Sequence, residues 1–96
     1  MDMESLMAQA QSLQTKIAAA QDSLGQMQVR GIGGDGDVVV TMTGKYDVLS
    51  VVIKPEILEN GASEVSRCVM EAYVDAKNKA DTLIEKTMNE VTGSLS

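Results

Sequence analysis

Three glycines spell the phosphate-binding pattern G-x-G-x-x-G, at Gly31, Gly33 and Gly36. In dinucleotide-binding proteins this pattern opens a helix, and the helix N-terminus holds the phosphates. Here the glycines precede residues 37–43, a Val-rich stretch that predicts a strand. We therefore interpret the glycines as turn formers and predict no nucleotide or other cofactor.

Other groups able to perform chemistry are scarce. The chain has no His and a single cysteine, Cys68, which disfavours most metal sites, a Cys–His pair and a Ser–His–Asp triad. Asp35 and Asp37 lack the loop length and distal Glu of an EF-hand and are interpreted as turn residues. Cys68 stands between Val65 and Val69 and is predicted to be a small core residue. We predict that the protein is not an enzyme, with no catalytic residue, metal site or small-molecule substrate.

Basic residues are few and outnumbered. Eight bases against fourteen acids give a formal net charge of −6, which repels nucleic acid and anionic membranes at long range. Contact with DNA would therefore depend on bases placed locally. Lys79 is close to Lys86 on a helical wheel and follows Asp75 by four residues, a spacing that favours an ion pair on a solvated surface. The residues we predict to contact phosphates are Lys16, Arg30, Lys77 and Lys79.

A long helix is predicted over residues 3–27. Its apolar or small residues alternate at intervals of three and four, a heptad pattern, at Met3, Leu6, Ala10, Leu13, Ile17, Ala20, Leu24 and Met27. Such a stripe packs on the chain's own core, or makes a coiled-coil-like contact with a second helix or a partner. The helix would be about 36 Å long, so part of it is expected to project from a domain of 96 residues.

Residues 27–54 predict a three-stranded antiparallel sheet with strands over 27–32, 37–43 and 46–54. Gly44-Lys45 suits a two-residue type II′ hairpin, which would place Val40 opposite Leu49 and Val38 opposite Val51. One hairpin face is then core, and the other is more apolar than a solvated face requires. The long helices or another subunit would cover this second face. For a homodimer we assign to the interface Val39, Tyr46, Val48 and Val52.

A second long helix is predicted over residues 63–91, with Ser63 as N-cap and Gly93 after its end. Residues 93–96 are expected to fray. The chain is thus predicted to be one α+β domain over residues 1–96, with the order α-β-β-β-α. No signal peptide or membrane-spanning run is recognised, and a lone cysteine fits a reducing compartment, so a cytoplasmic protein is expected.

Four stretches stand in a distinctive order over about residues 3–93. They are Met7-Ala-Gln-Ala-Gln, Gly33-Gly-Asp-Gly before Val38-Val-Val-Thr-Met-Thr-Gly, Val51-Val-Ile-Lys-Pro-Glu-Ile-Leu, and an Ala-rich helix with Ala72, Ala76 and Lys77. Together they resemble the YbaB/EbfC family of bacterial nucleoid-associated proteins. The resemblance implies a tweezer-like homodimer joined through the sheet region, which binds double-stranded DNA in nucleoid organisation and gene regulation.

The few bases predict weak, mostly sequence-tolerant DNA binding. The acidic charge favours an alternative, in which the chain is a protein-interaction module. There the heptad helix would dock a protein partner, without physiological DNA binding.

Overall fold

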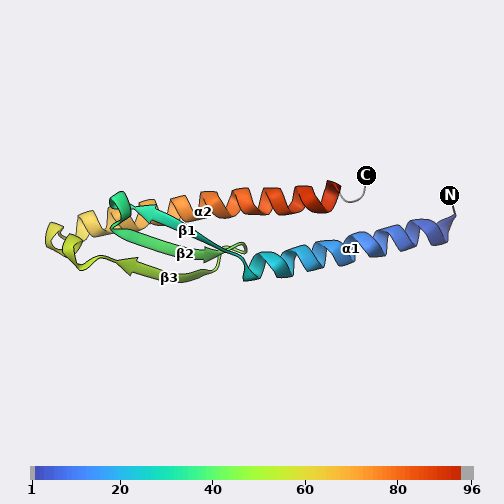
Figure 1. The fold of residues 1–96 in the computed structure, drawn as a ribbon, viewed down its shortest axis with the longest axis horizontal. Helices are drawn as coiled ribbons and strands as arrows, with labels where there is room; N and C mark the ends of the chain where they lie inside the picture. The colour runs from blue at the N-terminus through green and yellow to red at the C-terminus, as the bar shows by residue number, and fades with distance from the viewer. Residues whose placement is uncertain (1, 94–96) are drawn as a thin grey trace.

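The computed structural model describes residues 2–93. The elements follow the predicted order (Figure 1): α1 (Met3–Gln26), β1 (Gln28–Gly33), the 3-10 helix η1 (Gly34–Gly36), β2 (Val38–Thr43), β3 (Val48–Ile53), the 3-10 helix η2 (Pro55–Asn60) and α2 (Ala62–Gly93). The three strands form one antiparallel sheet in the order β1-β2-β3. The predicted α+β class and element order are therefore confirmed.

The molecule is elongated. Its extents are 69 × 18 × 15 Å, and its radius of gyration is 19.0 Å, against about 13 Å for a compact chain of similar length. The length arises because both helices extend beyond the same end of the sheet, and α1 continues past the end of α2 (Figure 1). Side chains of residues 2–12 are all exposed, so the expectation that part of the first helix projects is confirmed.

α2 packs directly on the backbone of β1. A Cβ atom on Gly31 would lie 2.0 Å from the carbonyl oxygen of Ala72, and one on Gly33 would lie 2.1 Å from that of Cys68. Only glycine permits such a close approach of helix and strand. Small buried residues continue the seam along α2, at Cys68, Ala72, Ala76 and Ala80. They cover the inward side chains of β2, which are Val38, Val40 and Met42.

The glycine pattern therefore divides between two roles. Gly34 and Gly36 have positive φ angles of 59° and 99° and form the turn of η1, as predicted. The interpretation of Gly31 and Gly33 as turn formers is wrong, because these residues make room for α2. Cys68 is 2% exposed, which confirms its assignment to the core.

Side chains of α2 also form hydrogen bonds along the free edge of β1. Three of them, one helical turn apart, reach the edge: Asp75 accepts from the N–H of Ile32 (2.9 Å), Glu71 accepts from the N–H of Gly34 (3.0 Å), and Lys79 Nζ donates to the carbonyl oxygen of Arg30 (2.8 Å). An edge strand with unpaired backbone groups is a template for further strand pairing. The polar row on α2 therefore occupies part of this edge of the sheet.

The predicted β2–β3 hairpin is wrong in its loop. Gly44 has no positive φ; Tyr46 does, at 69°. The N–H of Thr43 donates to the Asp47 carbonyl, and the Thr43 carbonyl accepts from the N–H of Tyr46, so the loop has three residues ending in a left-handed one. Gly44 is held by α1 instead, since its N–H donates to the carbonyl of Leu24 at 2.9 Å.

A bulge adds a second shift to the hairpin register. Met42 pairs with Val48 and Thr41 with Ser50, which leaves Leu49 as the extra residue. The longer loop and the bulge together move the pairing by two residues, so Val40 lies opposite Val51 rather than Leu49. Because side chains alternate with period two, a shift of two residues keeps Val51 on the predicted face.

Tyr46 and Val48 precede the bulge and leave the face predicted for them. Val48 is paired with Met42, whose side chain faces α2, and the hydroxyl of Tyr46 donates to Asp81 on α2. The grouping of Tyr46 and Val48 with Val39 and Val52 on one sheet face is therefore corrected. Before the bulge, only the longer loop moves the pairing, and it does so by one residue. A shift of one residue turns each side chain to the opposite face of the sheet.

α2 begins before its predicted cap. Ala62 is its first residue, and the N–H of Val65 already donates to the carbonyl of Gly61. Ser63 thus lies inside the first turn, and its N-cap assignment is wrong. α2 includes Gly93, and of the residues expected to fray, 94–96 lie outside the described range. Within residues 2–93 no helix has the length and apolar character needed to cross a bilayer.

Candidate nucleic-acid and dimer interface

The sheet face opposite α2 carries one polar and one apolar row. Strand pairing aligns Arg30, Thr41 and Ser50 across the three strands, and two residues further along it aligns Ile32, Val39 and Val52. Val52 is 59% exposed and Ile32 is 50% exposed. The pairing keeps Val39 and Val52 of the predicted dimer set together and adds Ile32, which the sequence analysis missed because β1 was not given a register.

β3 is the most exposed strand of the sheet. Val48, Leu49 and Val51 are each about half exposed, although two of them pair with inward residues of β2. The cause is the position of α2, which packs over β1 and β2 rather than β3 (Figure 1). The outer edge of β3 has no pairing strand in the sheet, so β3 offers backbone groups and apolar side chains together.

Two of the four predicted phosphate-contacting residues form ion pairs with carboxylates of α2. Lys79 pairs with Asp75 at 3.0 Å, as the i,i+4 spacing predicts, and Lys77 pairs with Asp81 at 3.3 Å. On the sequence Lys77 looks less compensated than Lys79, and the structure corrects this, because both lysines are paired with a carboxylate. The N–H of Ile32, together with Lys79, holds the pKa of Asp75 below its usual value. The Tyr46 hydroxyl and then Lys77 do the same to the pKa of Asp81.

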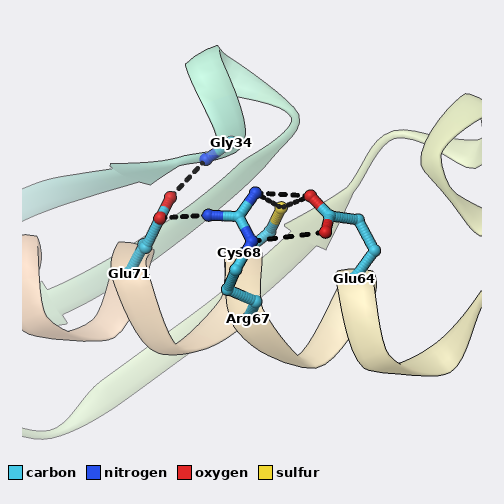
Figure 2. Close-up of polar contacts among 5 residues, drawn as sticks. All are labelled: Gly34, Glu64, Arg67, Cys68 and Glu71. Carbon is cyan, nitrogen blue, oxygen red and sulfur yellow. Dashed lines mark hydrogen bonds and ion pairs between the residues drawn. The ribbon is translucent and has the colours of Figure 1, made fainter. Parts of the chain in front are cut away.

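Arg67 is likewise neutralised within α2. Figure 2 shows its guanidinium lying between Glu64 and Glu71, with ion pairs to both, while Glu71 also reaches the backbone of Gly34. Hydrogen bonding to Arg67 lowers the pKa of Glu64. Burial raises the pKa of the neighbouring Cys68 thiol, which keeps it protonated and a poor nucleophile. This cluster ties η1 to α2 and presents no spare positive charge.

Of the other five bases, Arg30, Lys45 and Lys16 belong to β1, to the loop beside the end of α1, and to α1, whereas Lys54 follows β3 and Lys86 lies on α2. Arg30 and Lys45 are exposed, and neither has an ion pair within residues 2–93. Arg30 stands on the open face of β1, and the Lys45 side chain passes within van der Waals distance of Gly25 on α1. Lys16 lies further along α1 in a hollow shared with α2. Lys45 is not among the predicted phosphate-contacting residues, because its neighbour on α1, Gly25, is 20 residues away in sequence.

No group of three or more His, Cys, Asp or Glu side chains in the described residues could hold a metal ion. The arrangement instead offers a small basic surface, formed by Arg30 and Lys45 with Lys16 beyond it, and an apolar sheet face and edge beside it. The first is suited to phosphate contacts, and the second is suited to another polypeptide.

Comparisons with known proteins agree with this arrangement. The model of the YbaB/EbfC DNA-binding family matches residues 1–95. Nucleoid-associated protein bll8115 of Bradyrhizobium diazoefficiens is 40% identical over 95 residues, covering 98% of this chain and 90% of that protein. Nucleoid-associated protein PCC7424_2224 of Gloeothece citriformis is 37% identical, covering 98% and 82%.

A solved structure shares the fold. The crystal structure of the uncharacterized protein HP0035 from Helicobacter pylori superposes with a TM-score of 0.73 and covers 99% of this chain and 97% of that one, at 16% sequence identity. That family is described by DNA binding and not by a catalysed reaction. Because its model spans the chain almost from end to end, and relatives near 40% identity do the same, this chain belongs to the YbaB/EbfC DNA-binding family.

Proposed function

We propose that this chain is a homodimeric, DNA-binding, nucleoid-associated protein that acts in nucleoid organisation and gene regulation in the bacterial cytoplasm. The observation that carries the proposal is family membership over residues 1–95, with relatives named nucleoid-associated proteins. The structure adds an unpartnered apolar strand for a second copy and a basic surface beside it.

The homodimer is supported by the contrast between the two edges of the sheet. Side chains of α2 bond part of the β1 edge, whereas β3 has an unpaired edge and exposed Val48, Leu49, Val51 and Val52. Contiguous exposed apolar surface of this kind marks an interaction site. A second copy offers the same surface, so a two-fold contact would satisfy both strands at once. Val39 and Val52 of the predicted interface belong to it, together with Ile32.

Phosphate contacts are assigned to Arg30, Lys45 and Lys16. Arg30 presents a planar guanidinium that suits phosphate oxygens, and dimerisation would double each of these charges. Lys77 and Lys79, although predicted for this role, are placed second because Asp81 and Asp75 already compensate them. The short list of contacts and the net charge of −6 favour weak binding through the DNA backbone, with little base-specific readout.

A gel-shift titration tests the DNA proposal. Wild-type protein should shift a random-sequence duplex at low salt, and Arg30→Ala and Lys45→Ala should each weaken the shift by about tenfold, because each removes two positive charges per dimer. Lys77→Ala is the matched control. It removes the same formal charge from an existing ion pair and should weaken binding much less.

The absence of any shift at about 50 µM protein in low salt, where non-specific DNA binders bind, would overturn the DNA proposal. The interaction-module alternative would then stand. Equal losses in Arg30→Ala and Lys77→Ala would instead overturn the assignment of the basic surface.

A further inference from the structure

α2 covers the apolar stripe of α1 over only part of its length. Ala20 and Leu24 are 8% and 3% exposed, whereas Met3 and Leu6 are 75% and 45% exposed. The hollow between the two helices reaches along α1 only as far as Lys16, and α1 continues past the end of α2 (Figure 1). The stripe over residues 3–13, which we call the arm segment, is thus an unpartnered helix face in the described structure.

The arm segment carries one charged residue, Glu4, which is not part of the apolar stripe. No acidic or basic residue occurs between Glu4 and Lys16, in a chain whose formal net charge is −6. Two copies repel each other over most of their surface, but not here. A charged partner would find no complementary group on this face. The stripe therefore favours an uncharged apolar helix face, and the stripe of a second arm segment is such a face.

The spacing of the stripe is the same in both directions. Met3, Leu6, Ala10 and Leu13 are separated by intervals of three, four and three residues. In an antiparallel pair of identical segments, Met3 of one copy would meet Leu13 of the other, and Leu6 would meet Ala10. Large side chains would then oppose small ones at the centre, the arrangement that lets helices interdigitate.

A hollow already exists where the opposing side chain would enter. It has a volume of about 430 Å³, and its lining includes Leu6, Gln9, Ala10 and Leu13. These residues stand at i, i+3, i+4 and i+7, the four corners of a hole that receives a knob in helix packing. The small side chain of Ala10 leaves the hollow open.

The arm segment is also preformed as a helix. The side chain of Asp2 caps it by accepting from the N–H of Ser5 at 2.8 Å, and Ala, Leu, Met and Gln, all good helix formers, dominate its sequence. A preformed helix has less conformational entropy to lose when it pairs.

We propose that the arm segment pairs antiparallel with the arm segment of a second copy, at the end of the molecule remote from β3. This goes beyond the proposed function and does not depend on it. The contact area is small, so a single pair would be weak. Several copies held on one DNA would strengthen it through their high effective concentration, and arm pairing would link them end to end.

Site-specific cross-linking tests the geometry. In a Cys68→Ala background, Gln9→Cys places a thiol at the flank of the stripe, close to its own counterpart across an antiparallel pair. Ala8→Cys places one on the opposite side of the same turn and is the matched control. Mild oxidation should link Gln9→Cys into disulfide pairs several-fold faster than Ala8→Cys. Equal rates would overturn the antiparallel pairing.

Sedimentation velocity tests the association itself. Leu6→Glu places an acid in the stripe and should weaken assembly by about tenfold or more, while Ala8→Glu adds the same charge on the far side and should sediment as wild type. Circular dichroism should show equal helix content in both. Identical sedimentation of the wild type and both variants across the concentration range would overturn the proposal.

Val52→Lys, which disrupts the proposed sheet dimer, should leave Gln9→Cys cross-linking intact and so separates the two contacts.

Discussion

Gly31 and Gly33 show how single residues set the distance between α2 and the sheet. Their Cβ positions would lie 2.0 and 2.1 Å from carbonyl oxygens of α2, inside any tolerable contact. The neighbours are backbone atoms, which cannot rotate away as the end of a flexible side chain can. These two glycines therefore determine whether the helix can seat on β1.

Gly31→Ala should lower the free energy of unfolding by about 3 kcal/mol, at the upper end for overpacking, because Ala72 and Ala76 must move with the helix. Gly25→Ala is the control, since its Cβ would lie 3.4 Å from the flexible Lys45 side chain. Within α1 that change should stabilise by up to about 1 kcal/mol. Urea denaturation midpoints measure both changes. An unchanged midpoint for Gly31→Ala would contradict the close packing of α2 on β1 at this residue.

Asp75 links stability to pH. Its pKa in the folded chain is lowered, first by the N–H of Ile32 and then by Lys79. A lowered folded pKa contributes stability that is present above the unfolded pKa, about 3.9, and is lost as pH falls through the folded value. Asp75→Asn should therefore flatten the loss of stability below about pH 4, as followed by urea midpoints at pH 5 and pH 3. The same acid-induced loss in both proteins would refute this role.

At the scale of elements, the sheet has one partly bonded edge and one open edge. The polar row of α2 follows β1 with the repeat of one helical turn, so part of the β1 edge is already bonded. β3 has neither helix cover nor edge partner in the described chain. Further association through the sheet is thus directed to β3.

Val52→Lys tests whether β3 and its open face form the proposed dimer. A buried, unpaired ammonium in the interface should weaken dimerisation by at least about tenfold, as measured by light scattering after size-exclusion chromatography. Val74→Lys alters an α2 valine that is 45% exposed and should leave the dimer unchanged. A Val52→Lys protein with wild-type dissociation behaviour would place the interface elsewhere.

At the scale of the whole molecule, shape and charge act against each other. The extents of 69 × 18 × 15 Å give the chain a reach that a compact protein of this size lacks. Its net charge of −6 opposes DNA at long range, so the proposed binding depends on the locally placed Arg30, Lys45 and Lys16. Binding that rests on a few phosphate contacts is expected.

Salt dependence measures the number of those contacts. If Arg30, Lys45 and Lys16 of both copies each neutralise one phosphate, the log–log slope of affinity against salt is about −5, at about 0.9 per phosphate. Arg30→Ala should reduce that slope by about 2, whereas Lys77→Ala should not change it. A salt-independent affinity would contradict the phosphate model.

Local sequence alone determined the element order of this protein. Heptad spacing marks α1, clustered Val residues and glycines mark the sheet, and the Ala-rich run marks α2, because helix and strand periodicities are written in neighbouring residues. The family, too, is recognisable from the order of its stretches. The tertiary structure decided what depends on contact: the seat of α2 on Gly31, the bulge at Leu49, and the pairing of Lys77 with Asp81 beside Tyr46. These features depend on contacts between residues distant in sequence. The spacing of neighbouring residues carries no information about such contacts.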